Sequence, residues 1–263
     1  MRKVIIVALA ASALAACGTA EPEIAAPEYT ERQYMQAIND IARMDDLDDD
    51  ARRQPAALLA FAQIDKGELV GDFIMGSGYW TKLLAIAVGA DGKVYAFQPS
   101  EFIAMVPELG VQQDETVRRY SEDDGTPRQV LPLRGPMGDP GFPQAALDTI
   151  ITFQNYHDLY IADVPAGSAE AASKALYDAL KPGGVLVVVD HAAAQGAGIE
   201  AAQTLHRMDR QVAMDGLTAV GFVLEEESDL YANPQDDLSL SVFDESVRGS
   251  TDQFAWRLRK PES

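Results

Sequence analysis

The sequence predicts an α/β fold with a doubly wound, mostly parallel sheet and helices on both faces. From Glu68 onward, short β-branched runs alternate with helical stretches, which is typical of strands joined by crossover helices. The run GVLVVVDH is almost continuously apolar, as a strand buried on both faces must be. A pair of glycines follows the first strand and leads into a helical stretch. The predicted parallel strands are 69–73, 93–97, 128–133, 148–153 and 184–191.

Two helices are expected before the sheet. Residues 29–43 place Tyr34, Ile38 and Ile41 on one helical face, which predicts an amphipathic helix packed on the domain edge. A second helix is expected to begin at Pro55, because the fixed φ of proline suits the first helical turn.

Further helices are expected between and after the strands. Residues 79–88 carry an apolar stripe, and Ser168 is expected to cap the helix that follows the fourth strand. Residues 181–184 predict a turn into the fifth strand. Residues 205–221 predict one more helix, with His206 within it as a structural or rim residue.

The sheet is expected to end in an antiparallel pair, and one parallel strand is expected at an edge. Residues 222–231 and 252–260 are the two runs predicted to pair antiparallel across a long loop. Pro127 and Pro132 bracket the 128–133 run, which predicts an edge strand because proline cannot donate to a sheet ladder.

The composition predicts one domain with an acidic surface. Residues 29–263 show no repeat or internal linker, and 47% of the chain is hydrophobic, so a single core is expected. The chain has 21 basic and 41 acidic side chains, a net charge of -20. Such a surface repels phosphate backbones, so nucleic acid is not expected as a partner. The acidic run 45–50 lacks the spacing of a calcium loop and is expected to be solvated.

The N-terminal residues predict export and lipid anchoring. Residues 1–16 have a basic start, a short apolar stretch and small residues, the pattern of a cleaved signal peptide. Residues 14–17 resemble the lipobox of bacterial lipoproteins, which implies acylation of Cys17 as the new N-terminus. Residues 17–28 would then be a lipidated, flexible tether that holds the domain at the membrane of the cell envelope, facing the periplasm. The alternative is a cytoplasmic protein with an apolar N-terminal arm.

The glycine turn permits two interpretations. A strand that ends in Asp72 and passes through Gly76 and Gly78 into a helix exposes backbone N–H groups to a ligand, as nucleotide sites require. Glycine is also the ordinary residue of a tight turn between a strand and a helix. The turn alone does not decide between them.

The motifs along the chain resemble those of class I S-adenosylmethionine-dependent methyltransferases, which have a Rossmann-like sheet. The first motif of that family reads acid-x-Gly-x-Gly-x-Gly, which Asp72, Gly76 and Gly78 match while Ile74 stands at the first glycine. The runs KVYAF and ALKPGGVLVVVDH are similar to the second and fifth strands of the family. The runs TFQNYHDLY and LHRMD, with the C-terminal segment, resemble a bacterial subgroup described as predicted methyltransferases.

The resemblance implies S-adenosylmethionine as the cofactor. The residues implied to bind it are Asp72, Gly76, Ser77, Gly78, Gln98 and Asn155. In the family an acid at the end of the second strand accepts hydrogen bonds from the ribose hydroxyls, and Gln98 stands at that place here. A neutral amide accepts more weakly, at a cost of about 1–2 kcal/mol of binding free energy.

Polar side chains at the ends of two neighbouring strands predict the catalytic site. The expected catalytic residues are Tyr156, His157 and Asp158 after the fourth strand and His191 at the end of the fifth. Carboxyl ends of parallel strands meet at one sheet edge, so these side chains are expected to line one pocket there. A histidine would remove the proton of the methyl acceptor, oriented by Asp158 or Asp190. The alternative is that Asn155 and His157 satisfy backbone groups in a loop.

A metal site is not predicted. His157, His191 and a nearby carboxylate are ligand types that bind zinc, but no short ligand spacing supports such a site in the sequence.

The sequence leaves two functional hypotheses. The first is a membrane-tethered methyltransferase that acts on a small or envelope-associated acceptor. The second is a non-catalytic lipoprotein whose methyltransferase-like cleft binds another ligand or a protein partner. Ile74, Gln98 and the export signal motivate the second hypothesis, because adenosylmethionine is made in the cytoplasm.

Overall fold

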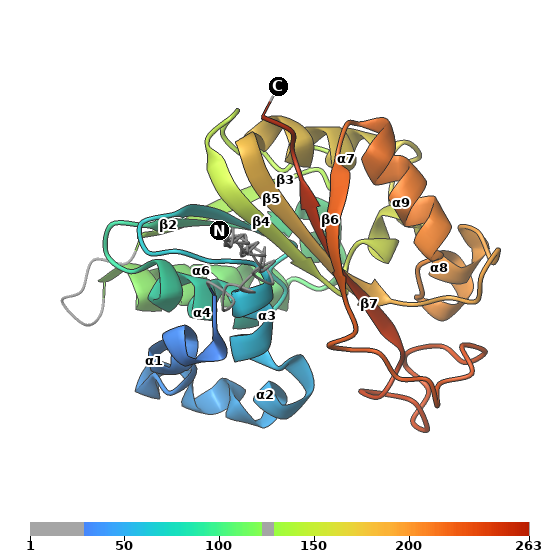
Figure 1. Ribbon diagram of the computed structural model, residues 1–263, viewed down its shortest axis with the longest axis horizontal. Coiled ribbons are helices and arrows are strands. Elements are labelled where there is room, and N and C mark those ends of the chain that lie inside the picture. The colour runs from blue at the N-terminus through green and yellow to red at the C-terminus, as the bar shows by residue number, and fades with distance from the viewer. Residues whose placement is uncertain (1–28, 123–128, 263) are drawn as a thin grey trace, which may run out of the picture.

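The computed structural model describes residues 29–122 and 129–262, and its centre is a seven-stranded sheet (Figure 1). The strands are β1 (Leu69–Phe73), β2 (Lys93–Pro99), β3 (Gln129–Gly135), β4 (Leu147–Phe153), β5 (Leu180–His191), β6 (Val223–Ser228) and β7 (Gln253–Arg259). Their order is β3-β2-β1-β4-β5-β7-β6, and β7 is antiparallel to both of its neighbours while the other neighbouring pairs are parallel. The predicted fold class is confirmed.

The strand order reverses between β1 and β4. From β1 the chain proceeds outward to β2 and β3, and then returns to place β4 on the other side of β1. Ligands of doubly wound sheets bind outside the carboxyl ends of the strands at such a reversal. The candidate site is therefore expected where β1 and β4 end.

Helices cover both faces of the sheet and create two hydrophobic clusters (Figure 1). On one face lie α3 (Pro55–Phe61), α4 (Tyr79–Val88) and α6 (Glu108–Glu122), and on the other lie α7 (Ser168–Ala179), α8 (Glu200–Leu205) and α9 (Arg210–Ala219). Residues 186–189 of β5 are fully buried between the two layers. Each such aliphatic side chain contributes roughly 1.5–3 kcal/mol by leaving water.

Both edges of the sheet carry residues that discourage further strand pairing. Pro132 lies in β3, which is the edge strand that the sequence predicted. At the other edge, β6 exposes three consecutive glutamates, of which Glu225 and Glu226 form ion pairs with Arg257 at 2.7 and 2.6 Å. Proline and exposed charge are both common on edge strands for this reason.

The predicted helix over 29–43 is broken into short pieces. These are η1 (Glu31–Tyr34), α1 (Met35–Ile38) and the start of η2 (Ile41–Asp46), and α2 (Leu47–Arg53) follows beyond the predicted range. The side chains of Asn39 and Arg43 donate to the carbonyls of Met35 and Ile38, at 2.8 Å each, and so satisfy carbonyls at the end of α1. Ile41 is consequently 79% exposed and does not belong to the core face. The predicted start of a helix at Pro55 is confirmed.

Three other local predictions are wrong. The residue that caps α7 is Gly167, with Ser168 as the first helical residue. The strand β5 begins at Leu180, so the predicted turn at 181–184 lies within it. The helix expected over 205–221 is interrupted after Leu205, because Asp209 caps a new helix by accepting a hydrogen bond from the backbone N–H of Gln211.

Two elements between β2 and β3 were not predicted: α5 (Ser100–Met105) and α6. In the described part of the chain no helix is long and apolar enough to cross a membrane. The signal peptide, Cys17 and the tether lie outside the described residues.

Candidate functional site

All three histidines of the chain gather in one cavity at the carboxyl edge of the sheet. This histidine cavity has a volume of about 430 Å³, and its polar wall consists of Gln154, His157, Asp158, Asp163, His191 and His206. Its apolar wall comes from α5, from Leu109 and Ile161, and from Val242 and Phe243. The ring centroids of His157 and His191 are 6.0 Å apart, so the predicted convergence of the two strand ends is confirmed.

Asp190 fixes the position of His157 between the ends of β4 and β5. Its carboxylate accepts the backbone N–H of His157 at 2.7 Å and bonds Nδ1 of the same ring at 2.8 Å. It also accepts the backbone N–H of His191 at 2.8 Å. Because Nδ1 of His157 is bonded to this carboxylate, Nε2 is the nitrogen that is left to face the cavity. Asp190 is thus the carboxylate that orients His157. The sequence had left Asp158 and Asp190 as alternatives for this role.

Asp158 and His206 complete a polar wall with His157. Oδ1 of Asp158 lies 3.3 Å from Nε2 of His157 and 3.8 Å from Nδ1 of His206. The rings of His157 and His206 are 5.5 Å apart, and Phe243 packs edge-on against His206 at 4.7 Å. His206 was not predicted as a site residue, because its position was expected to lie within a continuous helix.

His157 and His191 have opposite pKa shifts. Burial alone would lower the pKa of His157, but the carboxylates of Asp190 and Asp158 outweigh that effect and raise the pKa to about 9. For His191 burial dominates over Asp190 and lowers the pKa to about 4. At neutral pH, His157 is therefore charged and His191 is neutral.

Tyr156 does not line the histidine cavity, contrary to the prediction. Its side chain has no exposed surface, and its hydroxyl lies 2.9 Å from Oγ of Ser173 on α7. The residue precedes η3 (His157–Tyr160), whose turn directs Tyr156 and His157 to different surroundings. Tyr156 therefore belongs to the core beneath the site.

The glycine turn has the backbone geometry of a ligand-binding corner. Gly76 and Gly78 have φ values of 56° and 87°, and a Cβ on Gly78 would lie 2.8 Å from Oγ1 of Thr116. Within the described residues, the backbone N–H groups of Gly76 and Ser77 donate to no protein acceptor. Two donors at the entrance of α4 are thus left for a ligand.

Ile74 keeps the backbone conformation of the glycine that it replaces. Its φ is 67°, which is rare for a β-branched residue and costs on the order of 1–3 kcal/mol. The side chain is buried in the cluster beneath α7 and α9. The carbonyl of Ile74 accepts the side-chain amide of Asn155 at 2.9 Å, and the same nitrogen donates to the carbonyl of Phe153 at 2.9 Å. Asn155 therefore connects the ends of β1 and β4. It satisfies backbone groups, which was the alternative to a direct role in the site.

The carboxylate of Asp72 forms its hydrogen bonds with Thr81 at the start of α4. This buried carboxylate accepts the hydroxyl of Thr81 at 2.5 Å and also its backbone N–H. Burial raises the pKa of Asp72 to about 6, and the hydrogen bonds from Thr81 only partly offset this effect. The predicted cofactor residue thus holds the glycine turn against the helix.

Gln98 is a buried side chain without partners. It has no exposed surface, and neither its amide nitrogen nor its amide oxygen forms a hydrogen bond with the described residues. Buried polar groups are rarely left unpaired, because each costs roughly 1–3 kcal/mol. The unpaired amide at the end of β2 has the donor and acceptor groups that a pair of ribose hydroxyls would need. Because it has no exposed surface, the residues that cover it must move before a ligand can reach it.

The glycine turn at Gly76 and Gly78 lies near the histidine cavity but does not form part of its wall. The residues that line the cavity do not include Gly76, Ser77, Gly78 or Gln98. The two features are joined by the hydrogen bond from Asn155 to Ile74 across the β1–β4 reversal. The glycine turn, which was predicted to bind the cofactor, therefore does not line the pocket of the predicted catalytic histidines.

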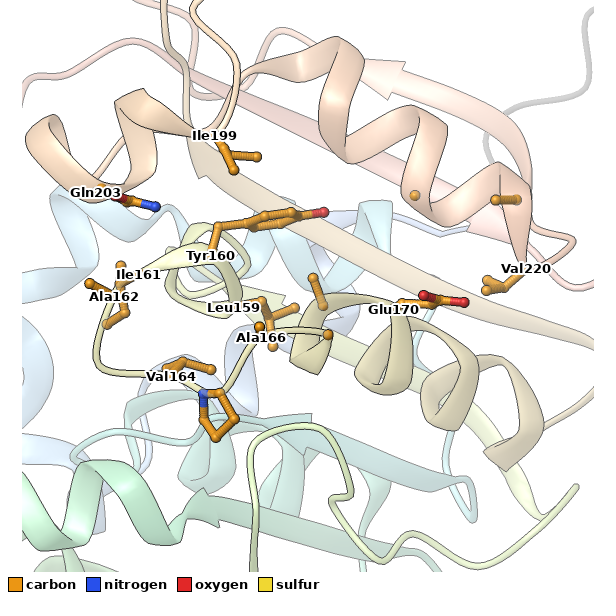
Figure 2. Close-up of a pocket in the computed structure, with 15 residues that line it drawn as sticks. Leu159, Tyr160, Ile161, Ala162, Val164, Ala166, Glu170, Ile199, Gln203 and Val220 are labelled. Atoms are coloured by element: carbon orange, nitrogen blue, oxygen red, sulfur yellow. The ribbon is translucent and has the colours of Figure 1, made fainter.

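A second, larger cavity of about 720 Å³ lies among η3, α7, α8 and α9 (Figure 2). Tyr160 lies between the segment that carries Ile199 and Gln203 and the helix that carries Glu170 (Figure 2). The wall is mostly apolar, and it shares Ile161 with the histidine cavity. The titratable side chains in its wall are those of Tyr160 and Glu170.

Comparison with known proteins supports the fold. No protein-family model and no curated protein matches the chain. Among solved structures, an S-adenosylmethionine-dependent methyltransferase from Aquifex aeolicus matches with a TM-score of 0.56 and 18% identity, covering 84% of this chain and 98% of that one. A putative methyltransferase from Bacillus halodurans matches with a TM-score of 0.53 and 20% identity over 80% of this chain and 99% of its own. The cyclase SpnF matches with a TM-score of 0.57 and 14% identity over 81% and 82%. The chain therefore has the Rossmann-like fold of the methyltransferase neighbours, with seven strands that are mostly parallel.

Proposed function

We propose that the protein is an S-adenosylmethionine-dependent methyltransferase. The observation that carries the proposal is the unpartnered, fully buried amide of Gln98 beside a glycine turn whose N–H groups are unused by the described residues. Both features lie at the carboxyl edge of a sheet with this fold. A polar group left unpaired at a cost in stability is expected where a ligand completes its hydrogen bonds.

The residues of the turn and of β2 would hold the cofactor. The N–H groups of Gly76 and Ser77 would donate to the methionine part of the cofactor, and the amide oxygen of Gln98 would accept hydrogen bonds from the ribose hydroxyls. Adenosylmethionine supplies an electrophilic methyl group when bound. Asp72 and Asn155 act indirectly, because they fix the turn through Thr81 and Ile74.

The acceptor would bind in the histidine cavity. Its apolar wall and its volume of about 430 Å³ suit a small molecule or the end of a larger envelope component. Nδ1 of His191 lies 2.7 Å from Oγ1 of Thr251, which leaves Nε2 to accept the proton of an acceptor hydroxyl or amine. Acceptor and cofactor must approach within near-attack distance for transfer, so the residues between Gly78 and the cavity are expected to move on binding.

The same geometry supports a second candidate function. Ile74 fills the place of a glycine, and the corner is separate from the cavity. A non-catalytic lipoprotein that uses the histidine cavity for another ligand or a protein partner is consistent with both observations. In either case we propose that Cys17 is acylated and holds the domain at the periplasmic face of a membrane.

Calorimetry of the full chain with S-adenosylmethionine, and with its demethylated product, tests the proposal. We expect saturable binding of both, weakened about 3–10-fold in Gln98→Leu because one or two neutral hydrogen bonds are lost. Gln113→Leu is the control, since Gln113 is equally buried but bonds the carbonyls of Ala96 and Leu133 at 2.8 and 3.0 Å. Absence of heat at millimolar ligand would favour the non-catalytic alternative.

A further inference from the structure

We propose that His157, Asp158 and His206 form a binding site for a divalent transition-metal ion of the zinc type. Two imidazole nitrogens and one carboxylate oxygen from these residues all lie within 4.8 Å of one another on the wall of the histidine cavity. Two histidines and one carboxylate are a common ligand set for zinc and related cations. The inference goes beyond the proposed function, because it concerns binding in the absence of adenosylmethionine.

The distances agree with a shared ion. In a tetrahedral zinc site with ligand bonds of about 2.0–2.1 Å, neighbouring ligand atoms lie about 3.4 Å apart. Oδ1 of Asp158 is 3.3 Å from Nε2 of His157 and 3.8 Å from Nδ1 of His206. The remaining edge, between the two histidine nitrogens, must contract by at most about 1.4 Å to reach that spacing. The side chain of His206 is 30% exposed, so we expect a rotation of its ring to supply this movement.

The surroundings supply the second layer that metal-bound histidines usually have. Nδ1 of His157 is bonded to the buried carboxylate of Asp190 at 2.8 Å, which directs Nε2 toward Asp158 and His206. Metal-bound histidines commonly donate their other nitrogen to a carboxylate in this way. Asp190 is itself fixed by backbone N–H groups of His157 and His191.

His206 is held in a conformation that brings it to the other two residues. Its φ is 51°, and α8 ends there, so the ring leaves the helix and lies against His157 and Phe243. A left-handed residue other than glycine is uncommon, although histidine is among the more tolerant types. Three protein ligands leave at least one coordination position, which would face the cavity and take an oxygen or nitrogen donor of a small molecule.

The test uses the full chain, purified without a histidine tag and stripped with a chelator. Titration with ZnCl₂ in a calorimeter is expected to give one site per chain, and Co²⁺ is expected to give the intense visible absorption of a tetrahedral site. Asp158→Asn and His206→Asn each remove one ligand. Asparagine at 206 tolerates the left-handed backbone. We expect each variant to weaken Zn²⁺ binding by at least about 100-fold, and Asp190→Asn to weaken it by about 10–100-fold.

His191→Asn is the matched control, because His191 lines the same cavity but is not one of the three ligands. It is expected to bind Zn²⁺ within about twofold of the unaltered chain. Equal loss in His191→Asn would overturn the assignment, as would unchanged binding in the Asp158→Asn/His206→Asn double variant or no saturable binding below millimolar Zn²⁺. Circular dichroism of each metal-free variant checks folding. If Asp158→Asn does not fold, His206→Asn decides alone, since its side chain is 30% exposed.

Discussion

Two buried glutamines illustrate how single residues separate stability from function in this protein. Gln98 and Gln113 both have no exposed surface. The side-chain nitrogen of Gln113 donates to two carbonyls, and its oxygen accepts Nε of Arg134 at 2.5 Å. Gln98 has no partner for either atom among the described residues. The first residue stabilises the fold, and the second costs stability unless a ligand binds it.

Replacement by leucine is therefore expected to have opposite effects on stability. Gln98→Leu removes an unpaired buried amide and should raise the free energy of unfolding by about 1–3 kcal/mol. Gln113→Leu leaves two carbonyls and Arg134 without their partner and should lower it by a similar amount. Urea unfolding at neutral pH measures both. A loss of stability in Gln98→Leu would mean that the amide already has a partner in the folded chain.

At the level of elements, Asp72 connects the end of β1 to the start of α4. The carboxylate accepts the hydroxyl and the N–H of Thr81 in the first turn of the helix. Negative charge at a helix N-terminus is favourable, but burial of the carboxylate is not, and burial is the larger effect on its pKa. The turn between them is thereby held in place for the backbone of Gly76 and Ser77.

The raised pKa of Asp72 predicts a pH dependence of stability. The folded chain holds this proton more tightly than the unfolded chain, with a pKa of about 6 against 3.8. The contribution of Asp72 to the free energy of unfolding therefore falls as the pH rises from about 4 to about 6, by on the order of 3 kcal/mol. Asp72→Asn stays neutral and keeps an acceptor for Thr81, so this component should vanish.

The measurement is urea unfolding of both proteins at about pH 4 and about pH 7. Subtracting the variant from the unaltered chain cancels other groups, such as Glu68, whose pKa is raised by burial to about 7. We expect the variant to be the more stable protein at the higher pH. Identical pH dependence of the two proteins would show that Asp72 is not buried as a carboxylate.

At the level of the whole molecule, the acidic composition and the proposed N-terminal tether predict which partners the domain meets. A net charge of -20 keeps the domain away from phosphate backbones and anionic lipid heads. The proposed attachment to a membrane would then depend on acyl chains at Cys17, and several chains hold a protein far more firmly than one.

The tether predicts a lipid-labelled protein. In bacterial cells supplied with a labelled fatty acid, the unaltered chain should incorporate label and sediment with membranes. Cys17→Ser should remove the label completely, because Cys17 is the only cysteine of the chain. Ser12→Ala, within the same signal segment, serves as the control and should retain it. An unlabelled wild-type chain would contradict the anchor and favour a cytoplasmic protein.

The strands of the sheet were predictable because their signals are local. Apolar runs such as 184–191, the glycines at 76 and 78 and the prolines around 128–133 indicate strands, a turn and an edge without any knowledge of neighbours. The same local signals placed His157 and His191 at one edge, and the structure confirms that placement.

Other features depend on contacts between segments far apart in the chain. His206 reaches the cavity because Asp209 caps a new helix. The adjacent buried Arg207 also forms an ion pair with Asp236, with 2.8 Å between its guanidinium nitrogen and the carboxylate oxygen. Tyr156 turns into the core because Ser173 of α7 offers a partner for its hydroxyl. The sequence by itself determined which segments form strands and which residues stand at the ends of those strands. Only the tertiary structure decided which of those side chains share a cavity, because that choice depends on hydrogen-bond partners that lie many residues away.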